Sequence, residues 1–375
     1  MQGVGQGGRP AHDGRTTQSA RGVPAAASAL HLPARTSHHC GTDPASDGEE
    51  FPEDTVNRAI AVVGPTGSGK TRLAIELAKR LDTEIISADS MQFYRGMEIG
   101  TAAPTADEQA EVKHHFVGFL QPDEEMAAGQ YQRLAREKAL ELLRQGRVPV
   151  LAGGSGLYIS AFIDGLFDGP ARNQAVRDRL RAEAAARGNA ALMERLRDVD
   201  PDYAAQLTSE NDLVRVVRAL EVFEVTGRTF SHWHREHQAT LEPWDVAQAA
   251  LLWERDALYE RINRRVDMMA AQGWREETQR LVDNGYEKDI YRLKALGYQE
   301  MAACLRGERT LDEALEATKQ HHRRYAKRQM TWFRSDKRIR WLPADDETAI
   351  AAWVEETARG LSLPADAEPP AEPTW

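Results

Sequence analysis

A phosphate-binding loop is the part of the sequence with the clearest chemistry. In the stretch GPTGSGKT, Gly64 is followed after four residues by Gly69, and then by Lys70 and Thr71. Glycines let backbone N–H groups converge on phosphate oxygens, the lysine adds a full positive charge, and the threonine hydroxyl can bind Mg²⁺. The pattern predicts a diphosphate or triphosphate site, and we call residues 64–71 the phosphate loop. Its members are Gly64, Pro65, Thr66, Gly67, Ser68, Gly69, Lys70 and Thr71.

A single carboxylate, Asp89, is the second group that could do chemistry. A nucleotide hydrolase should carry a Mg²⁺-binding acid after a further apolar strand, but the stretch VPVLAGG at residues 148–154 ends in glycines. Asp89 instead closes the apolar stretch at residues 84–90, and the ends of parallel strands line one crevice. We therefore expect Asp89 to face the phosphate loop, although an aspartate at a strand end is as often a turn or helix-cap residue.

Alternating strands and helices are needed to bring these groups together. Short apolar runs predict strands at residues 58–64, 84–90 and 148–154, with a weaker strand in HHFVGFL. A helical stripe follows the phosphate loop, and another helix is expected at residues 130–146. The alternation predicts an α/β fold, in which a P-loop-containing parallel sheet is covered by helices.

The expected domain organisation is a core interrupted by a helical insertion domain. Residues 165–245 read as charged helices, after which AQAALLWE predicts a returning strand, so the core is expected at residues 56–164 and 246–343. Residues 1–55 are predicted to be a disordered tail, with a transit peptide or a wrongly assigned start as alternatives. Residues 344–375 are predicted to be an acidic, partly disordered tail.

The bulk composition is ordinary for a soluble globular protein. The 375 residues are 41% hydrophobic and 28% charged, and no apolar run approaches the length of a membrane-spanning helix. The two cysteines, Cys40 and Cys304, form no metal or disulfide pattern, which favours a cytoplasmic protein, expected to be a monomer. His232, His234 and His237 lack the carboxylate or cysteine spacing of a zinc site, so we favour a polar helix face there.

The charge of the chain is unevenly distributed. The formal net charge of −10 alone argues against nucleic acid as a partner, yet residues 319–341 hold nine lysines and arginines and one acid, Asp336, interleaved with aromatic residues. Cations and aromatic rings on one helix suit phosphates and unstacked bases. The alternative is a solvated helix with an aromatic core stripe. We expect the aromatic residues to pack in the core and the cations to bind nucleic acid.

Several stretches occur in an order that is specific to one enzyme family: GPTGSGKT, ISADSMQFYRGMEIGTAAPT, GGSGLYI, RALEVFEVTGR, RINRRVDMM, KALGYQEM and KRQMTWFR. Over about residues 56–342 the chain resembles the tRNA dimethylallyltransferases, also called tRNA isopentenyltransferases. Family members usually carry threonine where Ser155 stands, and the hydroxyl is kept. The resemblance implies transfer of a dimethylallyl group from dimethylallyl diphosphate to N6 of adenosine 37, in the anticodon loop of tRNA, with no nucleotide hydrolysed.

The resemblance also implies roles for residues of the core. The phosphate loop would hold the donor's diphosphate with Mg²⁺ on Thr71, and Lys70 and Arg265 would stabilise the leaving group. Asp89 would accept the proton of the adenine amine. Without the resemblance, Arg265 reads as a surface helix arginine. We further hypothesise a channel that RNA enters at the Asp89 end and the donor enters at the phosphate-loop end.

The resemblance places tRNA contacts in several parts of the chain. A turn is the alternative role for Ser90, core packing for Met91, and a helix N-cap for Ser155. Val216 and Val217 are expected to be core residues within their patch. The full expected set is Asp89, Ser90, Met91, Gln92, Ser155, Arg177, Val214, Arg215, Val216, Val217, Arg218, Lys294, Ala295, Leu296, Gly297, Tyr298, Gln299, Lys327, Arg328 and Arg334.

Three other functions stay open on the sequence alone. A small-molecule P-loop kinase explains the loop and the sheet but not the basic aromatic segment. A non-enzymatic RNA-binding protein would not need Asp89. A prenyltransferase of free adenine nucleotides would not need the insertion or the basic segment.

Overall fold

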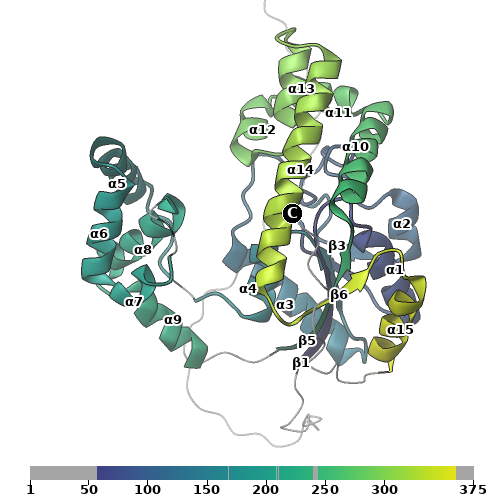
Figure 1. Cartoon of the computed structure of the whole chain (residues 1–375), viewed down its shortest axis with the longest axis horizontal. Coiled ribbons are helices and arrows are strands. Elements are labelled where there is room, and N and C mark those ends of the chain that lie inside the picture. Colours follow the sequence, from purple (N-terminus) through teal and green to yellow (C-terminus); the bar gives the residue numbers. More distant parts are fainter. Residues whose placement is uncertain (1–56, 168, 208, 210, 240–243, 360–375) are drawn as a thin grey trace, which may run out of the picture. The chain divides into compact units, whose positions relative to one another are not determined.

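A six-stranded parallel β-sheet organises the core (Figure 1). The computed structural model describes residues 57–359 except 168, 208, 210 and 240–243. The strand order is β3-β2-β4-β1-β5-β6, and all neighbouring strands are parallel. The strands are β1 (Asn57–Val63), β2 (Ile85–Ser87), β3 (His114–His115), β4 (Val150–Gly153), β5 (Trp244–Leu252) and β6 (Ile339–Pro343).

Helices pack on both faces of this sheet and extend beyond its carboxyl edge (Figure 1). The longest, α14, begins with a capping box in which Thr310 and Glu313 exchange hydrogen bonds. The core helices are α1 (Lys70–Arg80), α2 (Ala106–Glu111), α3 (Ala128–Arg144), α4 (Gly156–Ile163), α10 (Arg255–Ala271), α11 (Trp274–Asp283), α12 (Glu287–Leu293), α13 (Tyr298–Leu305), α14 (Leu311–Ser335) and α15 (Glu347–Ala358).

Strand β1 shows why the sequence folds this way. Its alternate residues enter two different apolar layers: Ala61 and Val63 pack with side chains of α3 and α4, and Ile60 and Val62 pack with side chains of α1 and α15. Because both faces are covered, the strand reads as a continuous apolar run rather than an alternating one. Pairing with β4 and β5 on either side fixes the end of β1, so the phosphate loop starts at a rigid point.

The predicted α/β fold with a parallel sheet is confirmed. The structure differs from the expectation at the C-terminal end, where β6 adds an edge strand and α15 forms a helix within the expected acidic tail. The physical reason is burial: Trp353 and Val354 of α15 lie in the apolar layer with Leu73 and Leu77 of α1. The acidic residues around Trp353 and Val354 led to the prediction of a partly disordered tail, so the contribution of these two side chains to the core was missed.

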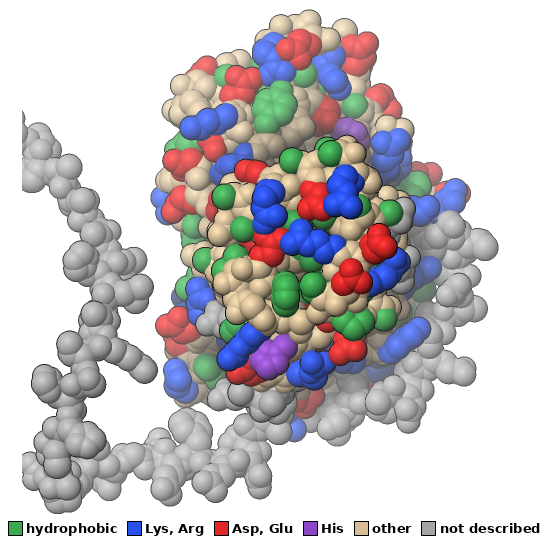
Figure 2. Space-filling model, turned by 90° about the vertical axis from the view of Figure 1, so that its left-hand side faces the viewer, with side chains coloured by type: hydrophobic (Ala, Val, Ile, Leu, Met, Phe, Trp, Pro, Cys, Tyr) green, Lys and Arg blue, Asp and Glu red, His purple; other side chains and the backbone are tan. Residues whose placement is uncertain are grey.

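The described residues between β4 and β5 that follow α4 form helices and connecting turns. They have an apolar cluster of their own, which includes Leu180, Leu192, Leu196, Val216 and Leu220. The helices are α5 (Gln174–Arg187), α6 (Asn189–Val199), α7 (Pro201–Ala204), α8 (Leu213–Thr226) and α9 (Phe230–Ala239). In Figure 2, which faces these helices, positive and negative side chains are interspersed over the surface.

Some expectations fall outside the described residues. The predicted tail at residues 1–55, Cys40, and residues 360–375 are not described, whereas Cys304 is described as a free, partly exposed thiol. Within the described ranges, no helix has the length and apolar character needed to cross a membrane.

Candidate active site

The phosphate loop connects β1 to α1 through three glycines with positive φ. Gly64, Gly67 and Gly69 have φ values of 133°, 79° and 96°, which side-chain-bearing residues rarely adopt. At Gly67 a Cβ atom would also lie 3.0 Å from Cγ1 of Ile262. Helix α1 starts at Lys70 without a side-chain cap, so its first N–H groups face the loop and favour an anion.

Two partly buried cations lie together beside the loop. The pKa of Lys70 is lowered to about 8, chiefly by desolvation and also by the nearby Arg265, while the Asp89 carboxylate partly offsets this shift. Burial likewise lowers the pKa of Arg265, although a guanidinium stays protonated in proteins. Arg265 donates to Thr66 Oγ1 at 3.3 Å and to the carbonyl of Ala102 at 3.2 Å. Two partly desolvated cations that lie close together are best stabilised by an anion bound between them.

Asp89 follows β2 and faces the same cations. Its Oδ1 accepts a hydrogen bond from the N–H of Met91 at 3.1 Å, so the expected turn role is real. Among the described residues no hydrogen bond reaches Oδ2, which leaves that oxygen able to accept a substrate proton. Ser155 occupies the N-cap position of α4, but its hydroxyl binds Ser90 instead of the helix, accepting from the N–H at 3.0 Å.

Two neighbouring cavities meet at the phosphate loop. The larger, about 920 Å³, is lined by five cations, by Glu98 and Glu108, and by apolar side chains that include Ile99 and Met268. The smaller, about 10 Å³, reaches Asp89, Gln92 and His114. Lys70, Thr71 and Pro104 line both cavities. The cations of the larger cavity are Lys70, Arg72, Arg261, Arg264 and Arg265.

The size of the smaller cavity bears on the channel hypothesis. A volume of about 10 Å³ matches one water molecule and is too small for a nucleobase. An adenine could meet Asp89 only after neighbouring side chains or loops move. The two-ended channel therefore stays a hypothesis.

Comparison with known proteins identifies the family. A family model described as IPP transferase matches residues 92–336. The tRNA dimethylallyltransferase of Geobacter sulfurreducens is 45% identical over 285 residues, which cover 76% of this chain and 91% of the relative. The chain belongs to the IPP transferase family. The resemblance drawn from the sequence motifs is thereby confirmed.

Solved structures of the IPP transferase family agree with this fold. The full-length tRNA isopentenylpyrophosphate transferase of Bacillus halodurans is 39% identical, with a TM-score of 0.60 over 81% of this chain and 96% of that chain. A eukaryotic dimethylallyltransferase acting on tRNA has a TM-score of 0.69 over 83% of this chain and 81% of that one. Its sequence identity is 24%, so that similarity shows the fold alone.

The tRNA contacts that family resemblance suggests differ in how far their side chains reach solvent. Val214, with 78% of its surface exposed, is the most open apolar member of the set. Tyr298 is fully buried, so it can shape a surface but presents no atoms to RNA. The buried members are Val216, Val217, Ala295, Gly297 and Tyr298; the exposed ones are Val214, Arg215, Lys294, Lys327 and Arg328; the partly exposed ones are Asp89, Ser90, Met91, Gln92, Ser155, Arg177, Arg218, Leu296, Gln299 and Arg334.

The arginines of helices α5 and α8 that are expected to contact tRNA are already engaged with carboxylates. Glu221 is fully buried and accepts from Arg177 and Arg218, each at 2.9 Å. Burial alone would raise the pKa of Glu221, but these hydrogen bonds hold it below its usual value. Arg215 lies 3.3 Å from Asp212. These arginines would therefore carry less free charge to RNA than their number suggests.

The basic segment, most of which lies on α14, matches the expected division into core aromatic residues and surface cations only in part. Phe333 is buried, while Trp332 keeps 39% of its surface exposed. Burial, and then the Asp89 carboxylate, raise the pKa of Tyr325, so this tyrosine lies near the site. Lys327 and Arg328 are exposed and take part in no ion pair with the described residues.

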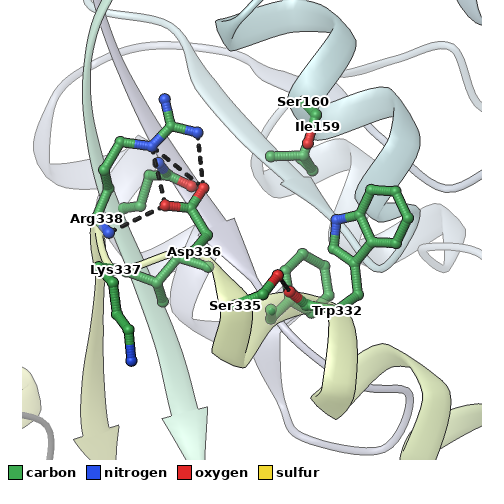
Figure 3. A pocket seen from close by; sticks show the side chains of 10 residues that line it. Ile159, Ser160, Trp332, Ser335, Asp336, Lys337 and Arg338 are labelled. Atoms are coloured by element: carbon green, nitrogen blue, oxygen red, sulfur yellow. Dashed lines mark hydrogen bonds and ion pairs between the residues drawn. The ribbon is translucent and has the colours of Figure 1, made fainter. Parts of the chain in front are cut away.

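A third cavity of about 310 Å³ lies where α14 ends, against α4 (Figure 3). There Arg338 binds Asp336 at 2.7 Å and Asp164 at 2.5 Å. Asp336, the one acid of the basic segment, thus neutralises a cation beside it and fixes the turn after α14. In Figure 3 the ring of Trp332 lies beside Ser160 on the other side of this cavity.

The histidine group on α9 shows packing rather than a ligand set. His234 lies with its ring 4.9 Å from that of Phe230, and His232 lies 3.7 Å from Glu236. Among the described residues no group of three or more His, Cys, Asp or Glu side chains could hold a metal ion.

Three residues that support the phosphate loop were missed by sequence reasoning. Gln329 of α14 accepts from the N–H of Thr66 at 2.9 Å and donates to the carbonyl of Gly154 at 2.8 Å. Trp253 donates to the Ser68 carbonyl at 2.8 Å, and Arg261 donates to the Gly67 carbonyl at 2.9 Å. The guanidinium of Arg261 also lies 4.2 Å from the centre of the Trp253 ring. No local sequence pattern predicts these contacts.

Proposed function

We propose that this protein transfers a dimethylallyl group from dimethylallyl diphosphate to N6 of adenosine 37 in tRNA. The observation that carries the proposal is the pair of partly buried cations, Lys70 and Arg265, at a phosphate loop that faces Asp89. Membership of the IPP transferase family supports the same reaction, because relatives at 45% identity carry the name tRNA dimethylallyltransferase.

The donor's leaving group has a suitable site. Breaking the allylic C–O bond leaves negative charge on the diphosphate, which the N–H groups of the phosphate loop, Lys70 and Arg265 would stabilise more strongly than they stabilise the ground state. The Thr71 hydroxyl borders the cavity and would hold Mg²⁺, and the buried Ser68 hydroxyl has no partner among the described residues. A bound Mg²⁺ would supply further charge neutralisation on the diphosphate.

The acceptor side needs a base, because the lone pair of an exocyclic adenine amine is delocalised. As the N6–carbon bond forms and the C–O bond breaks, the N6 proton would pass to Asp89 Oδ2. A carboxylate of ordinary basicity is sufficient, since the nitrogen becomes acidic only as it acquires positive character. The target base would have to leave the anticodon stack to reach this point.

The remaining parts of the proposal concern partners. Lys327 and Arg328 on α14 would contact RNA phosphates, and the insertion helices would contact the anticodon arm. We propose a cytoplasmic monomer that acts on tRNA.

The test is incubation of the protein with dimethylallyl diphosphate, Mg²⁺ and unmodified tRNA, followed by mass analysis of the nucleosides. Wild-type protein should yield N6-dimethylallyladenosine. Asp89→Ala should slow transfer by roughly 100- to 10,000-fold while tRNA binding is unchanged. Consumption of ATP with unmodified tRNA would favour a kinase, and prenylated free AMP would favour the nucleotide prenyltransferase.

A further inference from the structure

A buried carboxylate outside the phosphate loop receives three hydrogen bonds. Glu277 on α11 has 2% of its surface exposed. Its Oε2 accepts from the N–H of Ile99 at 2.8 Å, and its Oε1 accepts from the N–H of Gly100 at 3.0 Å and from the hydroxyl of Tyr298 at 2.6 Å. A desolvated carboxylate is tolerated only when it is satisfied in this way. Both backbone donors belong to one loop, at residues 97–103.

That loop forms a wall of the larger cavity. Ile99, Ala102 and Ala103 line the cavity together with Lys70 and Arg265. The loop docks so closely on α11 that a Cβ atom on Gly100 would lie 2.0 Å from the Trp274 ring. Position 100 therefore accepts only glycine, and the close contact fixes the position of the loop on α11.

The loop holds one strained residue, Ala102. Its φ of 46° is rare for a residue with a side chain, and such a conformation persists only where its surroundings fix it. The N–H of Ala102 donates to the carbonyl of Ile99 at 2.9 Å. Glu277 thus anchors the peptide units of Ile99 and Gly100, on which the conformation of Ala102 depends.

The Ala102 carbonyl connects the two sides of the site. It accepts from Arg265 at 3.2 Å and from the side-chain amide of Gln92, also at 3.2 Å. Arg265 lines the larger cavity, and Gln92 lines the smaller one with Asp89. The Ala102 carbonyl therefore orients both Arg265, in the larger cavity, and Gln92, which lies in the smaller cavity with Asp89.

We propose that Glu277 is a positioning residue for prenyl transfer, which seats the 97–103 loop so that the Ala102 carbonyl orients Arg265 toward the donor's diphosphate. The inference rests on the proposed function. It also gives Tyr298 a role distinct from RNA contact, as a buried donor that orients the Glu277 carboxylate.

The most informative variant is Glu277→Gln. The amide keeps the shape of the carboxylate but has a single acceptor oxygen, so it must lose the bond to Ile99 or the bonds to Gly100 and Tyr298. We expect KM for dimethylallyl diphosphate to rise about tenfold, which corresponds to about 1.4 kcal/mol, while KM for tRNA changes by less than about twofold. Affinity for inorganic diphosphate, measured by calorimetry without RNA, should fall in parallel.

Asp200→Asn is a matched control. Asp200 is also buried, and its two oxygens accept from the N–H groups of Tyr203 at 3.1 Å and Ser231 at 2.9 Å, but within the insertion helices. Both variants should lower the melting temperature, and only Glu277→Gln should change the donor parameters. Equal shifts in donor KM for the two variants would reduce Glu277 to a structural residue.

Tyr298→Phe keeps the test decisive if Glu277→Gln does not fold. It removes one donor and leaves the carboxylate, so we expect a smaller rise in donor KM, of about threefold. Wild-type donor KM in both variants would overturn the inference. Wild-type protein that transfers no dimethylallyl group would instead overturn the proposed function, so the two failures are distinguishable.

Discussion

At the scale of single residues, the protonation state of Lys70 decides how tightly the site binds a diphosphate. Lys70 is partly buried near Arg265, and its pKa is lowered to about 8. A bound diphosphate would reverse this by placing negative charge next to the ammonium. Free and bound protein therefore differ in protonation above pH 8, and binding in that range must take up a proton.

This difference gives a prediction with a definite sign. Below pH 8 Lys70 is charged in both states, so affinity for dimethylallyl diphosphate should be constant. Above pH 8 affinity should fall by up to about tenfold per pH unit, because the neutral amine must be protonated on binding. Calorimetry without RNA between about pH 7 and pH 9.5 measures this. In Lys70→Arg, whose guanidinium does not titrate, the curve should stay flat; the same fall there would assign the effect to another group.

Arg261 gives a second residue-scale prediction, about the shape of the phosphate loop. Its Nε donates to the Gly67 carbonyl at 2.9 Å, and Trp253 holds the next carbonyl. Because the Gly67 and Ser68 carbonyls accept hydrogen bonds from these side chains, they point away from the ligand site, and N–H groups of the loop can point toward it. Arg261→Lys keeps the charge but not the planar fork, so diphosphate affinity should fall by about fivefold.

Arg264→Lys is the control for this prediction. Arg264 lines the same cavity but binds no phosphate-loop carbonyl in the structure; its ion pair is with Glu260 at 3.6 Å. The same substitution there should change diphosphate affinity by less than about twofold. Equal losses in the two variants would attribute the effect to cavity charge rather than to loop shape.

These residues also show which parts of the candidate site could be predicted from the sequence. The phosphate loop is contiguous, so its spacing alone predicted it, and Asp89 followed from its place at the end of a predicted parallel strand. Gln329, Trp253 and Arg261 bind that loop from 263, 185 and 194 positions away in the chain. No periodicity encodes such pairs, because they arise only when β5 has joined the sheet and α10 and α14 have packed near the loop.

At the scale of elements, the core strands and helices were predictable and the C-terminal edge was not. β1, β2 and β4 are apolar runs bounded by glycine or polar turns, a pattern that local chemistry fixes. β6 has five residues, of which two are arginine and proline, and α15 lies in an acidic stretch. Both form because the sheet edge and α1 offer apolar surface, which is a tertiary effect.

Trp353 provides the test at this scale. Its side chain is fully buried in the apolar layer with α1, so Trp353→Ala should lower the free energy of unfolding by about 3–5 kcal/mol. The control on the same helix, Glu355→Ala, removes only solvent-accessible ion pairs, with Arg80 of α1 and with Arg359, and should cost at most about 1 kcal/mol. Chemical denaturation of both variants measures the difference. Similar losses would mean that charge rather than packing attaches α15.

At the scale of the whole molecule, a chain of net charge −10 must present a local positive surface to RNA. The arginines expected in the insertion do not provide it freely, because Arg177 and Arg218 share Glu221, and Arg215 pairs with Asp212. Lys327 and Arg328 are exposed and have no ion pair with the described residues. Lys294, at the end of α12, is likewise exposed and has no ion pair with the described residues, so within this expected set free positive charge for the RNA backbone lies on α14 and at Lys294.

This distribution predicts the salt dependence of RNA binding. Each phosphate contact to single-stranded RNA contributes a slope of about −0.7 to the logarithm of affinity against the logarithm of salt concentration. The double variant Lys327→Ala, Arg328→Ala should therefore reduce the magnitude of the slope for tRNA by about 1.4. Lys79→Ala, whose lysine already pairs with Glu111 at 2.8 Å, should leave the slope unchanged. If the double variant also left it unchanged, the positive surface that meets tRNA would have to lie elsewhere, and the insertion arginines would need to exchange their carboxylates for phosphates on binding.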